Sequence, residues 1–189
     1  THSRAGEATM VDSDGLIKWA PHNKLTYSDD FDEVGTDWVF RPTGTGSDPV
    51  VSTDAIIAPD GTQTADQIFF DAGAGTTTSD RSQVDQPADQ LSGVQYTFSV
   101  WLKVPSGNRT ILLLMDGGLV NTTVTINSNW QKYTLTGSPV TGGNRIVGLR
   151  YSGDLEAGEE SITVHAWGAH FYRSDLGGMV NNPDRGDSY

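Results

Sequence analysis

The sequence predicts an all-β fold in which two antiparallel sheets pack face to face as a β-sandwich, preceded by an extended N-terminal arm. Short runs rich in β-branched and aromatic residues recur along the chain, and clusters of Gly, Pro, Asp and Asn separate them. No segment shows a helical period over about ten residues. The 22 glycines mark turns and bulges, because apolar periodic runs persist between them. This combination is typical of a β-sandwich.

The chain divides into three parts. The arm occupies residues 1–24, where two weakly alternating stretches flank a turn at residues 12–15. Apolar residues such as Met10 and Trp19 lead us to expect that the arm packs on a neighbouring subunit. The sandwich occupies residues 25–172. A C-terminal loop or tail follows at residues 173–189, and we expect it to continue into a further module.

Residues 94–104 form the longest run of strand-forming residues, VQYTFSVWLKV, and we expect a central strand there. Alternation places Tyr96, Phe98, Val100 and Leu102 on one face, which we predict to be core. The opposite face is either a covered second surface or an exposed binding surface. It carries Thr97, Ser99, Trp101 and Lys103.

The remaining strands are expected wherever β-branched and aromatic residues lie between turn-forming clusters. In order, they are residues 49–57, 65–70, 109–115, 122–126, 131–135, 145–151 and 161–172.

Composition excludes several classes of partner. The formal net charge is −12, from 24 acidic and 12 basic residues. This excess of acid would repel a phosphate backbone, so we expect no nucleic-acid partner. No apolar run approaches the roughly 20 residues needed to span a bilayer, so we expect no membrane insertion. The absence of cysteine excludes disulfides and thiolate metal sites and leaves the redox compartment open.

The sequence contains no catalytic motif, and we expect no enzymatic activity. The histidines lie outside known motifs, and there is no G-x-S-x-G, no H-E-x-x-H and no phosphate-binding glycine-rich loop before a helix. His165 and His170 share one expected strand at an odd separation. They should therefore lie on opposite faces, unable to bind one metal ion without a bulge.

Three acidic residues, Asp29, Asp30 and Asp32, are the candidate metal ligands. Their carboxylates are the hard oxygen ligands that calcium prefers, although calcium takes about six to eight oxygens. The alternative, a solvated acidic turn, is favoured. Beyond a structural calcium ion, no cofactor is expected.

Four residues are candidates for ligand binding: Trp101, Arg150, His165 and Trp167. Sugars bind flat on aromatic rings while polar neighbours bind their hydroxyl groups. These residues would share the non-core face of one sheet if their strands are neighbours. Alternatively, they pack beneath the arm or against another subunit, because oligomeric proteins bury such faces at their interfaces.

Six blocks in a fixed order carry a resemblance to a known family. They are VDSDGLIKWAPHNKLTYSDDFD (11–32), the single residue Trp38, APDGTQTADQI (58–68), YTFSVWLKV (96–104), WQKYTLT (130–136) and AWGAHF (166–171). The series resembles the domain of bacteriophage head-spike, head-fibre and tail-fibre proteins, which is similar in fold to jelly-roll carbohydrate-binding modules. The chain departs from the usual family ending, WGAQLE, because His170, Phe171 and Tyr172 replace its last three residues.

The resemblance implies a structural protein on the surface of a phage particle, a fibre, spike or decoration module of the head or tail. Its implied partners are other virion proteins of the capsid or tail, further copies of itself with a trimer favoured, and a cell-surface saccharide of the host. A structural calcium ion near residues 29–32 is also implied. The alternative is a carbohydrate-binding module of a secreted bacterial protein.

Overall fold

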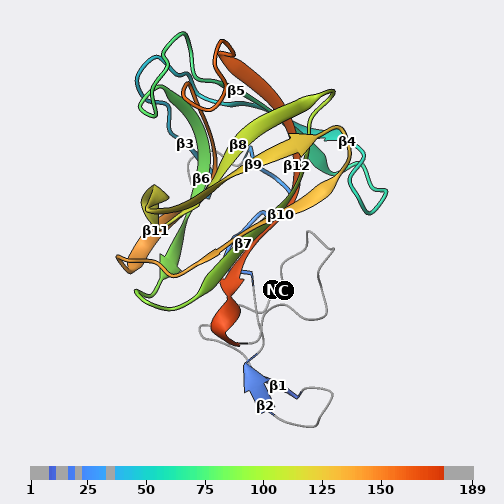
Figure 1. Cartoon of the computed structure of the whole chain (residues 1–189). Helices are drawn as coiled ribbons and strands as arrows, with labels where there is room; N and C mark the ends of the chain where they lie inside the picture. Colours follow the sequence, from blue (N-terminus) through green and yellow to red (C-terminus); the bar gives the residue numbers. More distant parts are fainter. Residues whose placement is uncertain (1–8, 12–16, 20–22, 33–36, 177–189) are drawn as a thin grey trace.

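The computed structural model of the 189-residue chain describes residues 9–11, 17–19, 23–32 and 37–176. Figure 1 shows two antiparallel sheets packed face to face, which confirms the predicted jelly-roll β-sandwich. The described residues contain no α-helix and two 3-10 turns, η1 (Asp116–Gly118) and η2 (Ser174–Leu176). None of the described helical turns is long and apolar enough to cross a membrane.

Each sheet has five strands and is named here after its central strand. The β12 sheet has the order β10 (Gln131–Gly137), β7 (Tyr96–Lys103), β12 (Ser161–Arg173), β5 (Ala65–Asp71) and β4 (Val50–Ile56). The β11 sheet has the order β3 (Val39–Phe40), β6 (Arg81–Gln90), β11 (Gly143–Ser152), β8 (Asn108–Met115) and β9 (Val120–Asn127).

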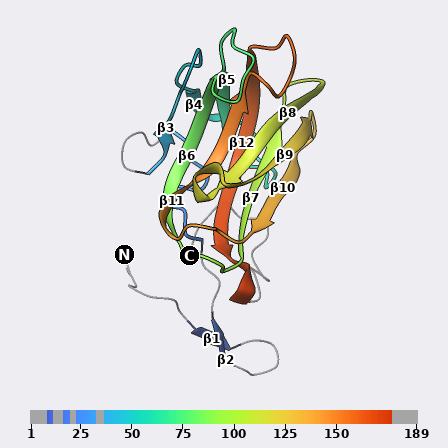
Figure 2. The same cartoon turned by 60° about the vertical axis from the view of Figure 1, so that its left-hand side comes forward.

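A short ribbon lies apart from the sandwich. Its strands β1 (Thr9–Val11) and β2 (Ile17–Trp19) pair antiparallel, and Figures 1 and 2 both draw them away from the two sheets. The turn predicted at residues 12–15 lies outside the described residues, as does most of the predicted tail. The division into arm, sandwich and tail, and the packing of the arm on a neighbour, stay predictions.

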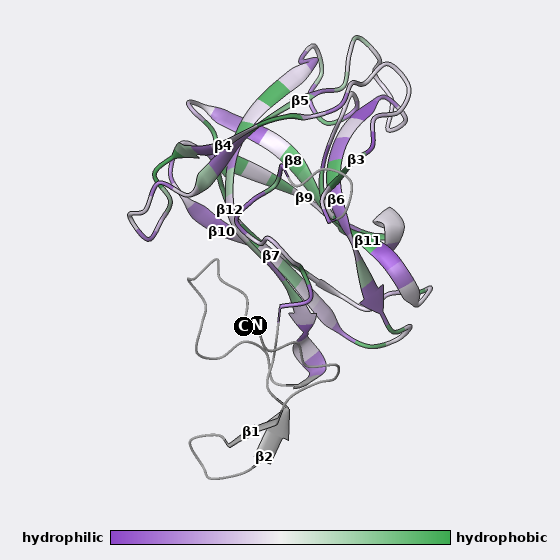
Figure 3. Cartoon of the chain, turned by 180° about the vertical axis from the view of Figure 1, so that it is seen from behind, coloured by the Kyte–Doolittle hydropathy of each residue, from purple (hydrophilic) through white to green (hydrophobic). Residues whose placement is uncertain are grey.

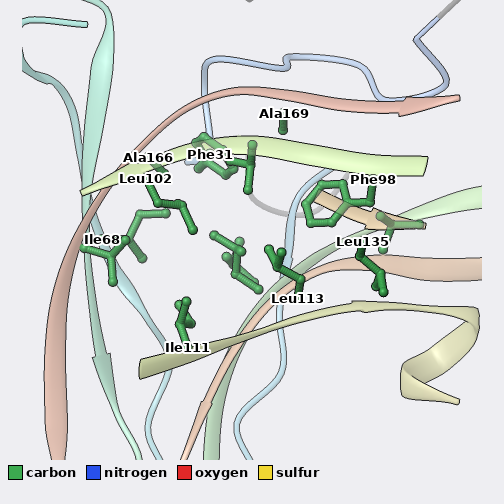
Figure 4. Close-up of a cluster of buried hydrophobic side chains, with 14 of the residues drawn as sticks. Phe31, Ile68, Phe98, Leu102, Ile111, Leu113, Leu135, Ala166 and Ala169 are labelled. Carbon is green, nitrogen blue, oxygen red and sulfur yellow. The ribbon is translucent and has the colours of Figure 1, made fainter. Parts of the chain in front are cut away.

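The core lies between the two sheets. The predicted core face of β7 is confirmed, because Tyr96, Phe98, Val100 and Leu102 are all fully buried. Residues from both sheets meet them there, as Figure 4 shows for Ile111 and other labelled side chains. Figure 3 shows the corresponding succession of hydrophobic and hydrophilic segments along the strands. Each such side chain stabilises the fold by about 1.5–3 kcal/mol.

The chain just before β3 completes the β12 sheet. Beyond Ala166, β5 no longer pairs with β12, and residues 23–28 take its place. The Lys24 N–H donates to Phe171 O at 2.7 Å, and the Ala169 N–H donates to Ser28 O at 2.7 Å. Asn23 adds a side-chain bridge to the same stretch of β12. This segment therefore belongs to the sandwich.

Strand β6 was not predicted from the sequence. Its RSQVDQPADQ sequence has one β-branched residue, Val84, and a proline, Pro87, both of which argue against a strand. Among the described residues, β3 pairs with β6 only at residues 84 and 85, so Pro87 interrupts no second ladder there. Long-range pairing with β11 along the whole of β6 forms the strand.

Candidate functional site

The outer face of the β12 sheet carries three of the four predicted ligand-binding residues. Trp101 on β7 and Trp167 on β12 are direct register partners, and His165 is the partner of Lys103. Arg150 lies on β11, in the other sheet. The prediction that all four share one face is therefore wrong for Arg150, because alternation assigns a residue to a face but cannot assign a strand to a sheet.

A bulge in β12 changes the predicted positions of its histidines. The register with β7 shifts between Trp167 and His170, where one extra residue is inserted. Gly168 lies in this stretch and has a φ of 62°, a conformation that glycine adopts without strain. His165 and His170 therefore lie on the same face, so their predicted opposite orientation is wrong. They remain four residues apart along β7, from Lys103 to Ser99, too far for one metal ion.

Trp167 lies beneath the connection between β4 and β5. Its side chain is 2 % exposed, and it packs with Ala58 and Ala65 in a second apolar cluster, separate from the main core. Its indole N–H donates to Thr64 Oγ1 at 3.0 Å. Trp167 is thus a buried support, and the connection closes this end of the face.

Two further tryptophans border this cluster and are only partly buried. Trp101 and Trp130 both pack against it. The indole N–H of Trp130 donates to Ile57 O at 3.0 Å, and Lys103 Nζ lies 4.9 Å from the centroid of the Trp130 ring. We call Trp101, Trp130, Trp167 and Lys103 the aromatic cluster. Trp130 was not among the predicted site residues, although it directly precedes a predicted strand.

His165 lies on the same outer face, beside the aromatic cluster. It is buried, and its Nε2 lies 3.3 Å from Gln67 Oε1. Burial, and secondarily the charge of Lys103, lowers the pKa of His165. The imidazole is therefore neutral at neutral pH and adds no charge to the aromatic cluster.

The outer face of the β11 sheet is built from charged and amide side chains. Asp85 on β6 is fully buried and accepts hydrogen bonds from Arg41 Nε, at 3.0 Å to each oxygen, and from Gln83 Nε2 at 2.6 Å. Gln83 Oε1 in turn accepts from Arg150 Nε at 2.6 Å. Burial raises the pKa of Asp85 despite these donors. We call this connected series the arginine row.

The metal site expected at Asp29, Asp30 and Asp32 stays a prediction. Asp30 and Asp32 lie close enough to interact, but nowhere in the described parts of the chain is a group of three His, Asp or Glu side chains arranged to hold a metal ion. A fourth carboxylate, Asp66, lies close enough for the charges of Asp30 and Asp32 to act on it. Its two oxygens accept from backbone N–H groups, those of Phe31 at 2.7 Å and Asp54 at 3.0 Å.

The pKa values of two of these carboxylates, Asp66 and Asp30, are raised. Burial raises the pKa of Asp66 to about 7, and the charges of Asp30 and Asp32 add to the effect. The pKa of Asp30 is also raised, first by burial and then by Asp32. At neutral pH a substantial fraction of Asp66 is therefore protonated.

No protein-family model matches the chain. No curated protein matches it either.

Solved structures show the same fold. An arabinose-bound GH51 α-L-arabinofuranosidase superposes with a TM-score of 0.55 at 14% identity, over 85% of this chain and 27% of that one. The family 11 carbohydrate-binding module of Clostridium thermocellum, in complex with a β-1,3-1,4-mixed-linked tetrasaccharide, gives a TM-score of 0.53 at 9% identity, over 82% and 96%. The enzymatically active domain of bacteriophage CBA120 tailspike protein 4 gives 0.51 at 12% identity, over 79% and 21%.

The fold defines the class of this protein: a jelly-roll β-sandwich of the kind found in carbohydrate-binding modules. At these identities the similarity concerns the fold alone. The chain spans about a quarter of the length of the arabinofuranosidase and the tailspike chain.

Proposed function

We propose that this protein is a non-enzymatic saccharide-binding module, displayed on a bacteriophage head or tail appendage and in contact with host glycans. The observation that carries the proposal is the aromatic cluster on the outer face of the β12 sheet. There, Trp101 and Trp130 keep part of their rings accessible above the buried Trp167.

The cluster has the chemistry that sugar recognition needs. A sugar ring lies flat on an aromatic face, and polar groups at the rim bind its hydroxyl groups. The indole of Trp130 is held by its bond to Ile57, so little side-chain entropy is lost on binding. Lys103 and Lys132 supply donors beside the rings, because Lys132 is the register partner of Trp101.

The phage role rests on the six-block resemblance and is supported by a fold shared with a phage tailspike domain. In this role the module is a homo-oligomer, with a trimer favoured, and it binds other virion proteins of the capsid or tail. The second candidate is a carbohydrate-binding module of a secreted bacterial protein, supported by the 96% coverage of the family 11 module. Mass spectrometry of purified virions separates the two, because only the phage role places this chain in the particle.

Saccharide binding is tested on a glycan array and then by calorimetry. Trp101→Ala and Trp130→Ala should each weaken binding roughly tenfold or more, since both remove a stacking surface. Phe69→Ala is the matched control, because Phe69 is a partly exposed aromatic residue on the same outer face. Equal losses in all three variants, or binding unchanged by the two tryptophan substitutions, would exclude the aromatic cluster as the site.

A further inference from the structure

Three arginines gather on the outer face of the β11 sheet. Arg81 and Arg150 lie on the neighbouring strands β6 and β11, and Arg41 follows β3 at the adjacent edge. We infer that this face binds the carboxylate group of an acidic saccharide. The inference rests on the proposed saccharide-binding function, but it concerns the face opposite to the aromatic cluster and a different class of sugar.

The arginine row orients two of the three guanidinium groups. Arg150 donates through Nε to Gln83, and Arg41 donates through Nε to Asp85. Among the described residues, no acceptor is hydrogen-bonded to the terminal nitrogens of either side chain. A guanidinium whose Nε is fixed presents its terminal N–H groups as a planar fork, which matches the two oxygens of a carboxylate.

At Arg150, the repulsion from Arg81 is a larger effect than the attraction of either nearby carboxylate. Asp85 is bonded to Arg41, and its charge acts on Arg150 together with that of the exposed Asp154. Burial lowers the pKa of Arg150, and the charge of Arg81 lowers it further. The Nε of Arg81 is buried and has no hydrogen-bond partner. An anion bound between the two arginines would relieve the repulsion between them.

Each of the other arginines of the described chain is paired with a carboxylate. Arg109 pairs with Glu156, Arg145 with Asp116, and Arg173 with Asp175. Because the whole protein carries a net charge of −12, anions are repelled from most of its surface. The gathering of three arginines on one face is therefore a local feature with a chemical use.

The strands beside Arg150 offer a surface for the rest of a sugar. Leu112 on β8 is the register partner of Arg150 and is partly buried, and Thr123 on β9 is the next residue across the sheet. Thr123 and Asn121 are exposed on the same face. Leu112 provides an apolar floor, and the hydroxyl and amide groups can bind sugar hydroxyls.

The test compares an oligosaccharide of uronic acid residues with the same oligosaccharide after reduction of its carboxyl groups to alcohols, by calorimetry on the full chain. The acidic form should bind roughly tenfold tighter or more, because charge-assisted bonds replace neutral ones. Arg150→Gln should abolish the difference, and Arg150→Lys should not restore it, because lysine lacks the planar fork. Arg173→Gln removes the same charge elsewhere and should leave binding unchanged.

A second variant covers the case in which Arg150→Gln fails to fold. Thr123→Asp places a negative charge on the exposed edge strand without removing a buried contact, and it should weaken binding of the acidic form alone. Equal affinity for the two forms, equal losses in Arg150→Gln and Arg173→Gln, or displacement of the oligosaccharide by an equal concentration of inorganic sulfate would overturn the inference.

The two proposals fail separately. Neutral glycans bound through Trp101 and Trp130, with no preference for the acidic form, would remove the inference and leave the proposed function. Binding of the acidic form that depends on Arg150 but not on the tryptophans would place the saccharide site on the β11 sheet instead of the aromatic cluster.

Discussion

The two outer faces of the sandwich both carry the outward side chains of alternating strands, but these side chains have different surroundings on each face. On the β12 sheet, the outward side chains of Trp167 and His165 are buried again, and Trp167 forms a small second core with Ala58 and Ala65. On the β11 sheet, outward side chains join into the hydrogen-bonded arginine row. Alternation alone therefore does not tell whether an outward side chain is exposed. The segments that cover the outer face of a sheet decide whether its side chains are buried or open to contact.

The largest expected effect is at the second core. Trp167→Ala should lower the free energy of unfolding by about 3 kcal/mol, because it leaves a cavity and removes the bond to Thr64. Trp101→Ala should cost only about 1 kcal/mol, since its ring is partly exposed. Urea denaturation of both variants measures the contrast, and equal losses would mean that the two rings are equally buried.

A smaller effect comes from the buried carboxylate of each sheet. Among the described residues, Asp66 accepts hydrogen bonds from backbone N–H groups alone, whereas Asp85 has an arginine partner. The pKa of Asp66 is raised from 3.8 to about 7, so the folded state binds the proton more tightly than the unfolded state. Stability from this group is full at low pH and is lost as the pH rises toward and through 7. Between about pH 5 and about pH 8 the loss should be roughly 2 kcal/mol.

Thermal or urea unfolding at a series of pH values checks this dependence. Asp66→Asn should flatten most of the slope, while Asp30, whose pKa is raised in the same direction, keeps a part of it. Asp89→Asn is the control, because Asp89 is exposed on the neighbouring sheet. A slope unchanged by Asp66→Asn would show that its carboxylate does not titrate in this range.

An effect of similar size tests how closely β11 packs against β6, the two strands that carry Arg150 and Asp85 of the arginine row. A Cβ atom at Gly148 would collide with the carbonyl oxygen of Val84 and lie 2.6 Å from Asp85 Cα. Gly148→Ala should therefore separate β11 from β6 locally and cost about 2 kcal/mol. Urea denaturation measures it, with Thr123→Ala at an exposed position of the same sheet as control. A cost near zero would show that the two strands adjust freely.

Much of the fold follows from the sequence, for a physical reason. Eight strands and the core face of β7 are predicted because alternation and β-branched content are local properties. Strand β6 is not, because its stability comes from pairing with β11 across about 60 residues of chain rather than from its own side chains.

The site is predicted less well than the fold. Trp101 and Trp167 are placed together by alternation and by the regular pairing of β7 with β12. Arg150 is misplaced because sheet membership depends on chain crossings that no local pattern records. The cover over Trp167 depends on a loop 103 residues away in sequence, as its bond to Thr64 shows.

The bulge at Gly168 shifts the inward and outward alternation of side chains along β12 by one residue. Up to Ala166 the core receives even-numbered residues of β12, and from Ala169 it receives odd-numbered ones. If Gly168 stayed in the chain without forming the bulge, regular alternation would turn Phe171 toward solvent and His170 into the core, undoing the seat of residues 23–28 as well. One glycine thereby reverses which side chains of β12 face the core, from even-numbered residues before the bulge to odd-numbered residues after it.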